Sequence, residues 1–327
     1  MKGRILSGMR PTGSLHIGHL SVLENWVQMQ KEYETFFMVA DWHALTTAFD
    51  DTETLNEKVR DMLLDWLSVG IDPGKSTVFI QSHIKEHAEL HLLLSMVTPL
   101  SWLERVPTYK DQIQQLGKEG RDINTYGFLG YPLLQAADIL VYRADTVPVG
   151  EDQLPHLEFS REVARRFNFL YDAHVFPEPQ AKLSKLALLP GVDGRKMSKS
   201  YHNDISMTED TEGINKKVRQ MVTDPQRIRK DDPGDPEVCV VFTYHKIYNQ
   251  EELKEIEKDC TAGTIGCVDC KKKLAVKIDG VLAPIREKRR ELEKTPDLID
   301  DVIGTGERKA KEAAESTMEK VWKAMGI

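Results

Sequence analysis

Residues 4–30 combine a short apolar strand, a turn rich in glycine and proline, and the start of a helix. Residues 5–8 are predicted to be a buried strand end and residues 9–13 a turn, because proline and glycine interrupt regular structure there. Leu20, Leu23 and Trp26 then recur at the spacing of one helix face. Strand, turn and helix in this order begin a βαβ unit, so the chain is predicted to be an α/β protein with a parallel sheet.

Two histidines lie three residues apart at the predicted start of this helix. His16 and His19 fall on one helix face, so both imidazole rings can point at one ligand. Gly18 leaves room for a flat group against the backbone, and the free amides of a helix start favour negative charge. The segment therefore indicates a nucleotide site, with two surface histidines as the simpler alternative.

Strands and helices alternate through the first 200 residues. Residues 35–40 and 77–80 are continuous apolar runs, as expected for parallel strands covered on both faces. Helical or loop patterns occupy the other segments: helices at 55–67, 131–142 and 153–166, a short strand at 147–150, a flexible excursion at 117–130 and a long loop at 171–195.

Strand signals become rare after Ser200, and charged helical patterns replace them. This shift predicts a domain boundary near residue 200, and 327 residues are enough for two domains. The last helix has an apolar stripe and therefore needs a surface to cover. The helices predicted in this part span residues 212–221, 244–258, 268–292 and 308–325.

Two lysines three residues apart stand within the predicted loop. Lys196 and Lys199, with hydroxyl groups on Ser198 and Ser200, could close on a triphosphate and neutralise the charge that builds on leaving pyrophosphate. Glycines before them would let the loop swing shut. The alternative is an ordinary solvated loop rich in lysine and serine.

Together these two segments resemble the signatures of a known family. Residues 16–19 read HIGH and residues 196–200 read KMSKS, so the chain resembles the class I aminoacyl-tRNA synthetases over nearly all its length. The resemblance implies a Rossmann-type parallel-sheet catalytic domain at 1–200 with a helical dimerisation insert, an α-helical anticodon-binding domain at 201–306, and a C-terminal helix at 307–327 that packs back on the first domain. A nucleotidyltransferase with an HxGH turn is the alternative, but such proteins lack the full KMSKS loop.

The resemblance also implies the chemistry and its residues. ATP is a substrate accompanied by Mg²⁺, an aminoacyl-adenylate is the intermediate, and tRNA is the acceptor. Positioning and electrostatics carry the reaction, with no protein nucleophile. The expected catalytic residues are His16, His19, Lys110, Lys196 and Lys199. Those expected to bind ATP are Arg10, Pro11, Thr12, Gly18, His19, Gly150, Glu151, Asp152, Leu189, Lys196, Met197, Ser198, Lys199 and Ser200.

The helix at 131–142 resembles the specificity helix of the tryptophanyl and tyrosyl members. Tyr131, Gln135 and Asp138 share one helix face, and a carboxylate at the base of an apolar slot can accept an indole N–H or a phenol O–H. The resemblance also places Gln153 on the substrate ammonium group and His43 near the pocket. Residues 147–153 resemble the tryptophanyl version, so tryptophan is favoured over tyrosine.

All four cysteines follow residue 238. Cys239, Cys260, Cys267 and Cys270 are separated by 20, 6 and 2 residues, and clustered cysteines in a cytosolic protein are more often metal ligands than disulfides. Four thiolates fit Zn²⁺ or a [4Fe–4S] cluster. The spacing resembles that of a subset of bacterial tryptophanyl enzymes with a [4Fe–4S] cluster, which favours iron–sulfur. Four unrelated buried thiols are the alternative.

A run of lysines and arginines follows the last cysteine at 271–290 and would suit tRNA(Trp), although an ordinary solvated helix face is the alternative. The resemblance suggests a homodimer with residues 87–109 at the contact. The chain has a net charge of -8, no leader and no apolar run of membrane length, so a cytoplasmic protein without a membrane or DNA partner is expected. An inactive RNA-binding paralogue remains a further alternative.

Overall fold

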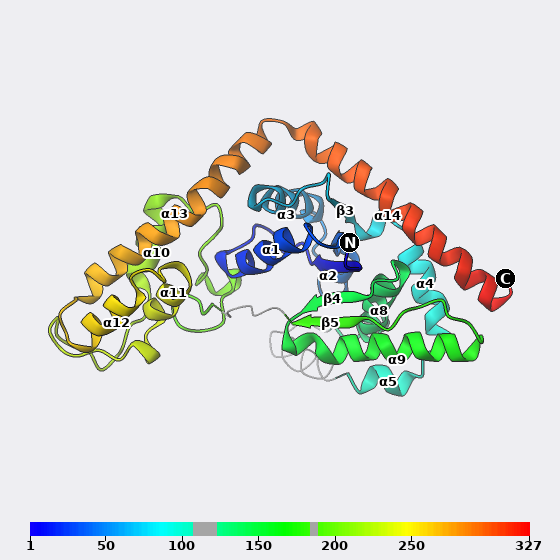
Figure 1. Cartoon of the computed structure of the whole chain (residues 1–327), viewed down its shortest axis with the longest axis horizontal. Coiled ribbons are helices and arrows are strands. Elements are labelled where there is room, and N and C mark those ends of the chain that lie inside the picture. The colour runs from blue at the N-terminus through cyan, green and yellow to red at the C-terminus, as the bar shows by residue number, and fades with distance from the viewer. Residues whose placement is uncertain (107–122, 184–188) are drawn as a thin grey trace.

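A parallel sheet organises the first part of the computed structural model, which describes residues 1–106, 123–183 and 189–327 (Figure 1). Within these residues the sheet has five strands in the order β3-β2-β1-β4-β5. The chain moves outward from β1 to β2 and β3, then returns to the other side of β1, so the strand order reverses between β1 and β4. The predicted α/β class is confirmed. The strands are β1 Arg4–Met9, β2 Glu34–Val39, β3 Ser76–Ile80, β4 Thr146–Val149 and β5 Gln180–Leu183.

Both faces of the sheet are buried because side chains alternate along its strands. In β2, Phe37 and Val39 pack with helices α1 (Ile17–Met29) and α3 (Leu55–Val69), whereas Phe36 and Met38 point to the opposite face. Aromatic rings reinforce each layer: Trp26 stacks on Phe37 with centroids 4.5 Å apart. The opposite face is covered by α4 (Glu86–Ser95), α8 (Tyr131–Val141) and α9 (Leu154–Leu170).

The helical part of the chain is built around the long helix α13 (Cys267–Glu293). It packs against α10 (Thr211–Gln220) and α11 (Val240–Tyr248) on one side and against α3 of the sheet layer on the other. Its buried residues Leu274 and Ile278 belong to the same hydrophobic core as α1 and α3. The helical part is therefore joined to the sheet part by direct packing.

Helix α14 (Pro296–Met325) returns across the sheet and covers its β3 edge (Figure 1). The contact is so close that a Cβ added at Gly306 would lie 1.7 Å from the backbone oxygen of Val78. Further along, the indole Nε1 of Trp322 donates a hydrogen bond to Glu89 of α4 at 2.9 Å. Covering an edge strand in this way removes a site for unwanted strand pairing.

Four segments differ from the sequence predictions. Within the predicted excursion at 117–130, residues Tyr126–Leu129 form helix α7, which the Thr125 hydroxyl caps by accepting the Phe128 N–H at 3.1 Å. Strand β5 lies inside the predicted loop at 171–195, since an edge strand needs no apolar alternation to pair with β4. The predicted helix at 244–258 is two helices, because the chain breaks at Asn249 between α11 and α12 (Leu253–Thr261). The C-terminal helix begins at Pro296 rather than near residue 308.

Three short helices complete the main elements of the described segments: α2 Asp41–Ala48, α5 Leu100–Glu104 and α7 Tyr126–Leu129. In the described parts of the chain, none of the helices has both the length and the apolar character needed to span a membrane.

Candidate nucleotide and amino-acid site

A cavity of about 740 Å³ opens where the strand order reverses. Its walls include Gly8 and Met9 at the carboxyl end of β1 and Val149 at the end of β4. This is the place where open parallel sheets bind ligands. The predicted site residues that line it are Arg10, His19, His43, Tyr131, Gln135, Asp138, Gly150, Asp152, Gln153 and Lys196.

His16 and His19 form the start of α1 through reciprocal hydrogen bonds. His16 is the N-cap residue, and its Nδ1 accepts the backbone N–H of Gly18 at 3.2 Å. The Nδ1 of His19 accepts the N–H of His16 at 3.3 Å, and the two ring centroids are 3.9 Å apart. Because both Nδ1 atoms act as acceptors, the neutral rings carry their protons on Nε2.

The environment keeps both rings neutral. Burial lowers the pKa of His16 below its usual range, and burial together with His16 and Lys199 lowers the pKa of His19 to about 3. The pair can therefore donate two N–H groups without adding charge. A Cβ at Gly18 would come within 3.0 Å of the His16 ring and 3.4 Å of the Met197 sulfur, so glycine permits this close packing.

The second signature lies directly against the first. The Nζ of Lys199 donates a hydrogen bond to the backbone oxygen of Thr12 at 3.1 Å, and His16 pairs with Ser206 in an antiparallel bridge. Asn203 was not predicted, yet it organises the segment: its Oδ1 accepts the Ser198 N–H at 2.8 Å and its Nδ2 donates to the Lys196 oxygen at 3.1 Å. Asn203 thus fixes the backbone at Lys196 and Ser198, while Lys199 lies close enough to His16 and His19 to lower the pKa of both.

Asp138 lies at the base of the cavity and is held by three side chains. Gln81 Nε2 lies 2.9 Å from both carboxylate oxygens, His43 Nε2 lies 2.9 Å from Oδ2, and His87 Nδ1 lies 2.7 Å from Oδ1. Behind it, the hydroxyl of Tyr142 lies 2.8 Å from His87 Nε2. Burial by itself would raise the pKa of Asp138, but His87 and His43 lower it to about 2. The site therefore presents a fixed anionic acceptor.

Gln81, His87 and His156 were missed from the sequence. Gln81 directly follows β3, and a polar residue at the carboxyl end of a parallel strand could have indicated it. His156 lines the cavity, and its Nε2 lies 3.3 Å from the Tyr131 hydroxyl. His87 carries no comparable signal because it acts through Asp138 from another helix.

The remaining predicted residues lie around the cavity rim or away from it. Pro11 is buried, Glu151 is exposed in a short 3-10 helix, and Leu189 packs against the core near Met197. Ser200 belongs to the short 3-10 helix Lys199–Tyr201. Lys110 lies outside the described residues, and so do residues 117–122 of the predicted excursion.

Cys239 is the N-cap residue of α11, Cys260 lies in α12, and Cys267 and Cys270 lie in the first turn of α13; the four thiols are close enough to interact. Burial, together with the other three thiols, raises the pKa of Cys270 to about 12. The Nη1 of Arg227 lies 3.7 Å from the Cys267 sulfur and 3.9 Å from that of Cys260. Among the described residues, no three Cys, His, Asp or Glu side chains are gathered as a single metal ion requires.

The basic run of α13 is largely paired. Lys273 and Lys277 contact Glu252, Arg286 contacts Asp279, and Arg289 is buried. Arg289 is therefore not part of an exposed surface for RNA, and the alternative of a solvated face with interspersed acids describes much of this helix.

Comparison with known proteins agrees with this geometry. The family model of class I tRNA synthetases (W and Y) matches residues 2–283. The tryptophan–tRNA ligase of Thermotoga maritima is 54% identical over 99% of both chains, and that of Aquifex aeolicus is 47% identical over 99% of this chain and 100% of its own.

A solved structure is similar over the whole length as well. The tryptophanyl-tRNA synthetase of Campylobacter jejuni, in complex with ADP and tryptophan, has a TM-score of 0.87 at 33% identity and covers 99% of this chain and 100% of its own. The chain belongs to the class I tRNA synthetases of the tryptophan and tyrosine group.

Proposed function

We propose that this chain is a tryptophan–tRNA ligase, which activates L-tryptophan with ATP and transfers it to the 3′ end of tRNA(Trp). The carrying observation is that Lys199 contacts Thr12 beside the His16–His19 pair, next to a cavity that His19 and Lys196 line and whose base is the ionised Asp138. Relatives of this name align over 99% of the chain.

In the first step the tryptophan carboxylate attacks the α-phosphorus of ATP, a bond to phosphorus forms, and the bond to the leaving pyrophosphate breaks. The Nε2–H groups of His16 and His19 hold phosphate oxygens, and Lys196 and Lys199 neutralise the charge on pyrophosphate. Mg²⁺ accompanies the phosphates of ATP and offsets their charge. The terminal ribose hydroxyl of tRNA then attacks the aminoacyl carbonyl and releases AMP.

Selection of tryptophan falls to the base of the cavity. An indole N–H donates to the carboxylate of Asp138, beside the bond from His43, while Tyr131, Gln135 and Gln153 line the walls. An amino acid without a donor at that point leaves a buried charge less well satisfied.

Amino-acid-dependent exchange of pyrophosphate into ATP tests the proposal. Tryptophan should support exchange and tyrosine should not, and tRNA(Trp) should then be charged. Exchange with tyrosine alone would identify the tyrosine enzyme. No exchange with any amino acid would favour an RNA-binding paralogue, and turnover indifferent to tRNA would favour an unrelated nucleotidyltransferase.

We also propose that Cys239, Cys260, Cys267 and Cys270 hold a [4Fe–4S] cluster. The donor set fits, because four neighbouring thiols could supply the four thiolate ligands that such a cluster takes. Such a cluster would stabilise the fold of the helical part and would have no redox role. Protein purified without oxygen should contain iron and sulfide, and Cys267→Ser should lose both. A zinc-loaded, colourless preparation would contradict this assignment.

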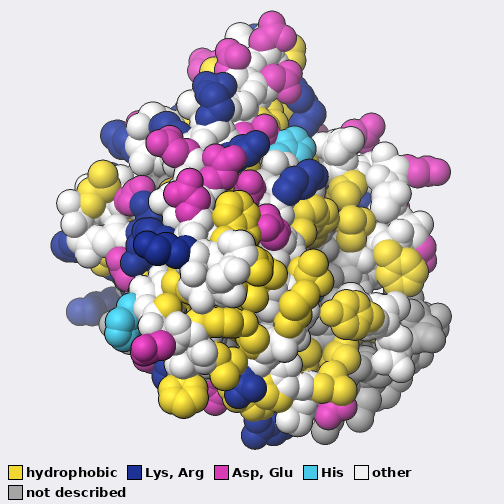
Figure 2. All heavy atoms as spheres, turned by 90° about the vertical axis from the view of Figure 1, so that its right-hand side faces the viewer, with side chains coloured by type: hydrophobic (Ala, Val, Ile, Leu, Met, Phe, Trp, Pro, Cys, Tyr) yellow, Lys and Arg dark blue, Asp and Glu magenta, His cyan; other side chains and the backbone are white. Residues whose placement is uncertain are grey.

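The exposed face of α4 and α5 suggests a homodimer contact (Figure 2). Leu92 on α4, Met96 at its C-cap and Leu100 at the start of α5 are each more than half exposed, and all three lie within the predicted contact at 87–109. A second copy of the chain is the proposed occupant. Met96→Asp should shift the mass measured by light scattering to a monomer, whereas Val276→Asp, an exposed apolar position on α13, should not. A monomeric unmodified protein would exclude the proposal.

A further inference from the structure

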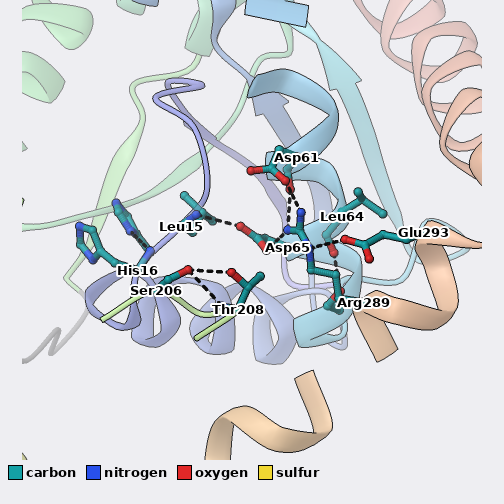
Figure 3. A network of polar contacts seen from close by, with 11 residues as sticks. Leu15, His16, Asp61, Leu64, Asp65, Ser206, Thr208, Arg289 and Glu293 are labelled. Atoms are coloured by element: carbon teal, nitrogen blue, oxygen red, sulfur yellow. Dashed lines mark hydrogen bonds and ion pairs between the residues drawn. The ribbon is translucent and has the colours of Figure 1, made fainter. Parts of the chain in front are cut away.

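A buried ion-pair network joins α13 of the helical part to α3 of the sheet layer (Figure 3). The guanidinium of Arg289 contacts the carboxylates of Asp61 and Asp65 on α3, and its Nε donates to Glu293 at 3.0 Å. A further bond runs from Nη1 to the backbone oxygen of Asp61 at 3.2 Å. Arg289 is 8% exposed and Asp65 is fully buried, so the pair is shielded from solvent.

Asp65 connects this network to the first signature. Its Oδ2 accepts the backbone N–H of Leu15 at 2.9 Å, one residue before His16. The same turn is also bonded to the segment after KMSKS. The backbone oxygen of Leu15 accepts the N–H of Met207 at 3.0 Å, and the N–H of Ile17 donates to the backbone oxygen of Ile205 at 2.8 Å. The histidine turn is thus held between α3 and the segment that follows KMSKS.

Asp65 provides a hydrogen-bond acceptor that an apolar side chain at the same position would lack. Two well-packed apolar residues in place of a buried ion pair are often equally or more stable, so stability alone does not require the pair. The buried N–H of Leu15, however, precedes the helix and needs an acceptor that an apolar side chain does not supply. A carboxylate held by Arg289 meets this need at a fixed position.

We propose that Asp65 is a positioning residue for the ATP site and that Arg289 couples this site to α13. Asp65 holds the Leu15 amide, and with it the Nε2–H groups of His16 and His19, while Arg289 sets where Asp65 stands. A shift of α13, which begins at Cys267 and carries the basic run, would therefore move Asp65 and, through the Leu15 amide, the turn that holds His16 and His19. The inference rests on the proposed ligase function.

The test compares Arg289→Met and Asp65→Leu with Arg60→Met. Arg60 is the matched control, because it also links α3 to the C-terminal helices, through Asp300 and the oxygen of Pro296, but is exposed and has no bond to Leu15. The KM values for ATP and tryptophan are measured by pyrophosphate exchange, the protection of the Leu15 amide by hydrogen exchange, and the Tm by calorimetry.

We expect Arg289→Met and Asp65→Leu each to raise the KM for ATP about tenfold, leave the KM for tryptophan within about twofold, and speed exchange at Leu15. The double variant should be no worse than either single one, because both act on one network. Arg289→Lys, which retains a positive charge, should recover part of the loss.

A lower Tm with unchanged KM for ATP and unchanged Leu15 exchange, as in Arg60→Met, would show a purely structural pair and overturn the proposal. If Arg289→Met does not fold, Asp65→Leu and Arg289→Lys decide by the same criteria. If the unmodified protein supports no exchange with any amino acid, the ligase function fails, and equal Leu15 protection in all variants would then refute the network by itself.

Discussion

The ammonium group of Lys199 lies 3.1 Å from the backbone oxygen of Thr12, which places the second signature against the turn before the first one, across 187 residues of sequence. Burial lowers the pKa of Lys199 below its usual range, although the carboxylates of Asp204, Asp61 and Asp65 oppose this effect. In the proposed mechanism this group neutralises charge on pyrophosphate and does not contact the indole. Lys199→Ala should therefore slow adenylate formation roughly 100-fold and leave tryptophan binding nearly unchanged.

Rapid-quench measurement of adenylate formation, with tryptophan affinity measured by calorimetry, separates these effects. Lys311→Ala is a suitable control, because Lys311 is exposed on α14 and pairs only loosely with Glu315 at 3.8 Å. Equal losses of tryptophan affinity and of rate in Lys199→Ala would contradict the assigned role.

Asp138→Asn keeps the shape of the side chain but replaces one acceptor oxygen with a donor among His43, His87 and Gln81. We expect the KM for tryptophan to rise ~10- to 100-fold, with the KM for ATP little changed, because the lost bond involves a charged acceptor. Steady-state exchange at varied tryptophan measures this.

The control for this change is Asp145→Asn. Asp145 accepts the backbone N–H of Arg4 at 2.9 Å, at the amino end of the sheet and away from the cavity. The same chemical change there should leave tryptophan selection intact. Unaltered selectivity in Asp138→Asn would remove Asp138 from the recognition of the indole.

Local patterns in the sequence could predict the fold class and much of the site. The pairs His16 with His19 and Lys196 with Lys199 stand in short motifs, and Asp138 shares a helix face with Tyr131, so spacing alone groups them. Arg289 and Asp65 are separated by 224 residues and meet only because α13 packs on α3. Neither helix pattern indicates its partner, and long-range polar pairs of this kind were therefore missed.

The prediction of a loop at residues 180–183 was wrong for a related reason, because the pairing partner lies elsewhere in the sequence. Residues 180–183 read Gln-Ala-Lys-Leu and lack strand propensity, yet they form β5 because β4 offers an unpaired edge. Asn249 ends α11 as its C-cap residue, buried and with its side-chain amide 3.1 Å from His245 Nδ1 one turn earlier, whereas the apolar spacing alone predicted one continuous helix.

The neutral state of His19 leads to a prediction about pH. With its folded-state pKa lowered to about 3, the ring should remain neutral in the folded protein as the pH falls through 6.5. The unfolded chain binds a proton there, so the free energy of unfolding should decline as the pH falls from 6.5 towards 3. Nuclear magnetic resonance of labelled histidine should show no titration of His19 between pH 5 and 8. A midpoint near 6.5 would mean that the phosphate-binding turn carries positive charge.

Asp65 should produce the opposite dependence. One guanidinium, Arg289, faces three carboxylates, those of Asp61, Asp65 and Glu293, and Lys199 is the other cation that interacts with Asp65. Burial accordingly raises the pKa of Asp65 from 3.8 to about 6, against the effects of Arg289 and the Leu15 amide.

Because the folded state binds the Asp65 proton more tightly than the unfolded chain, this group favours folding most at low pH, and its contribution falls as the pH rises from about 4 to 6. Relative to Asp65→Asn, which does not titrate, the unmodified protein should lose about 3 kcal/mol of unfolding free energy over this window. Urea denaturation of both proteins at a series of pH values measures the difference. A flat difference between pH 4 and 6, with any relative gain confined to lower pH, would show instead that the ion pair with Arg289 outweighs burial and that Asp65 is ionised throughout.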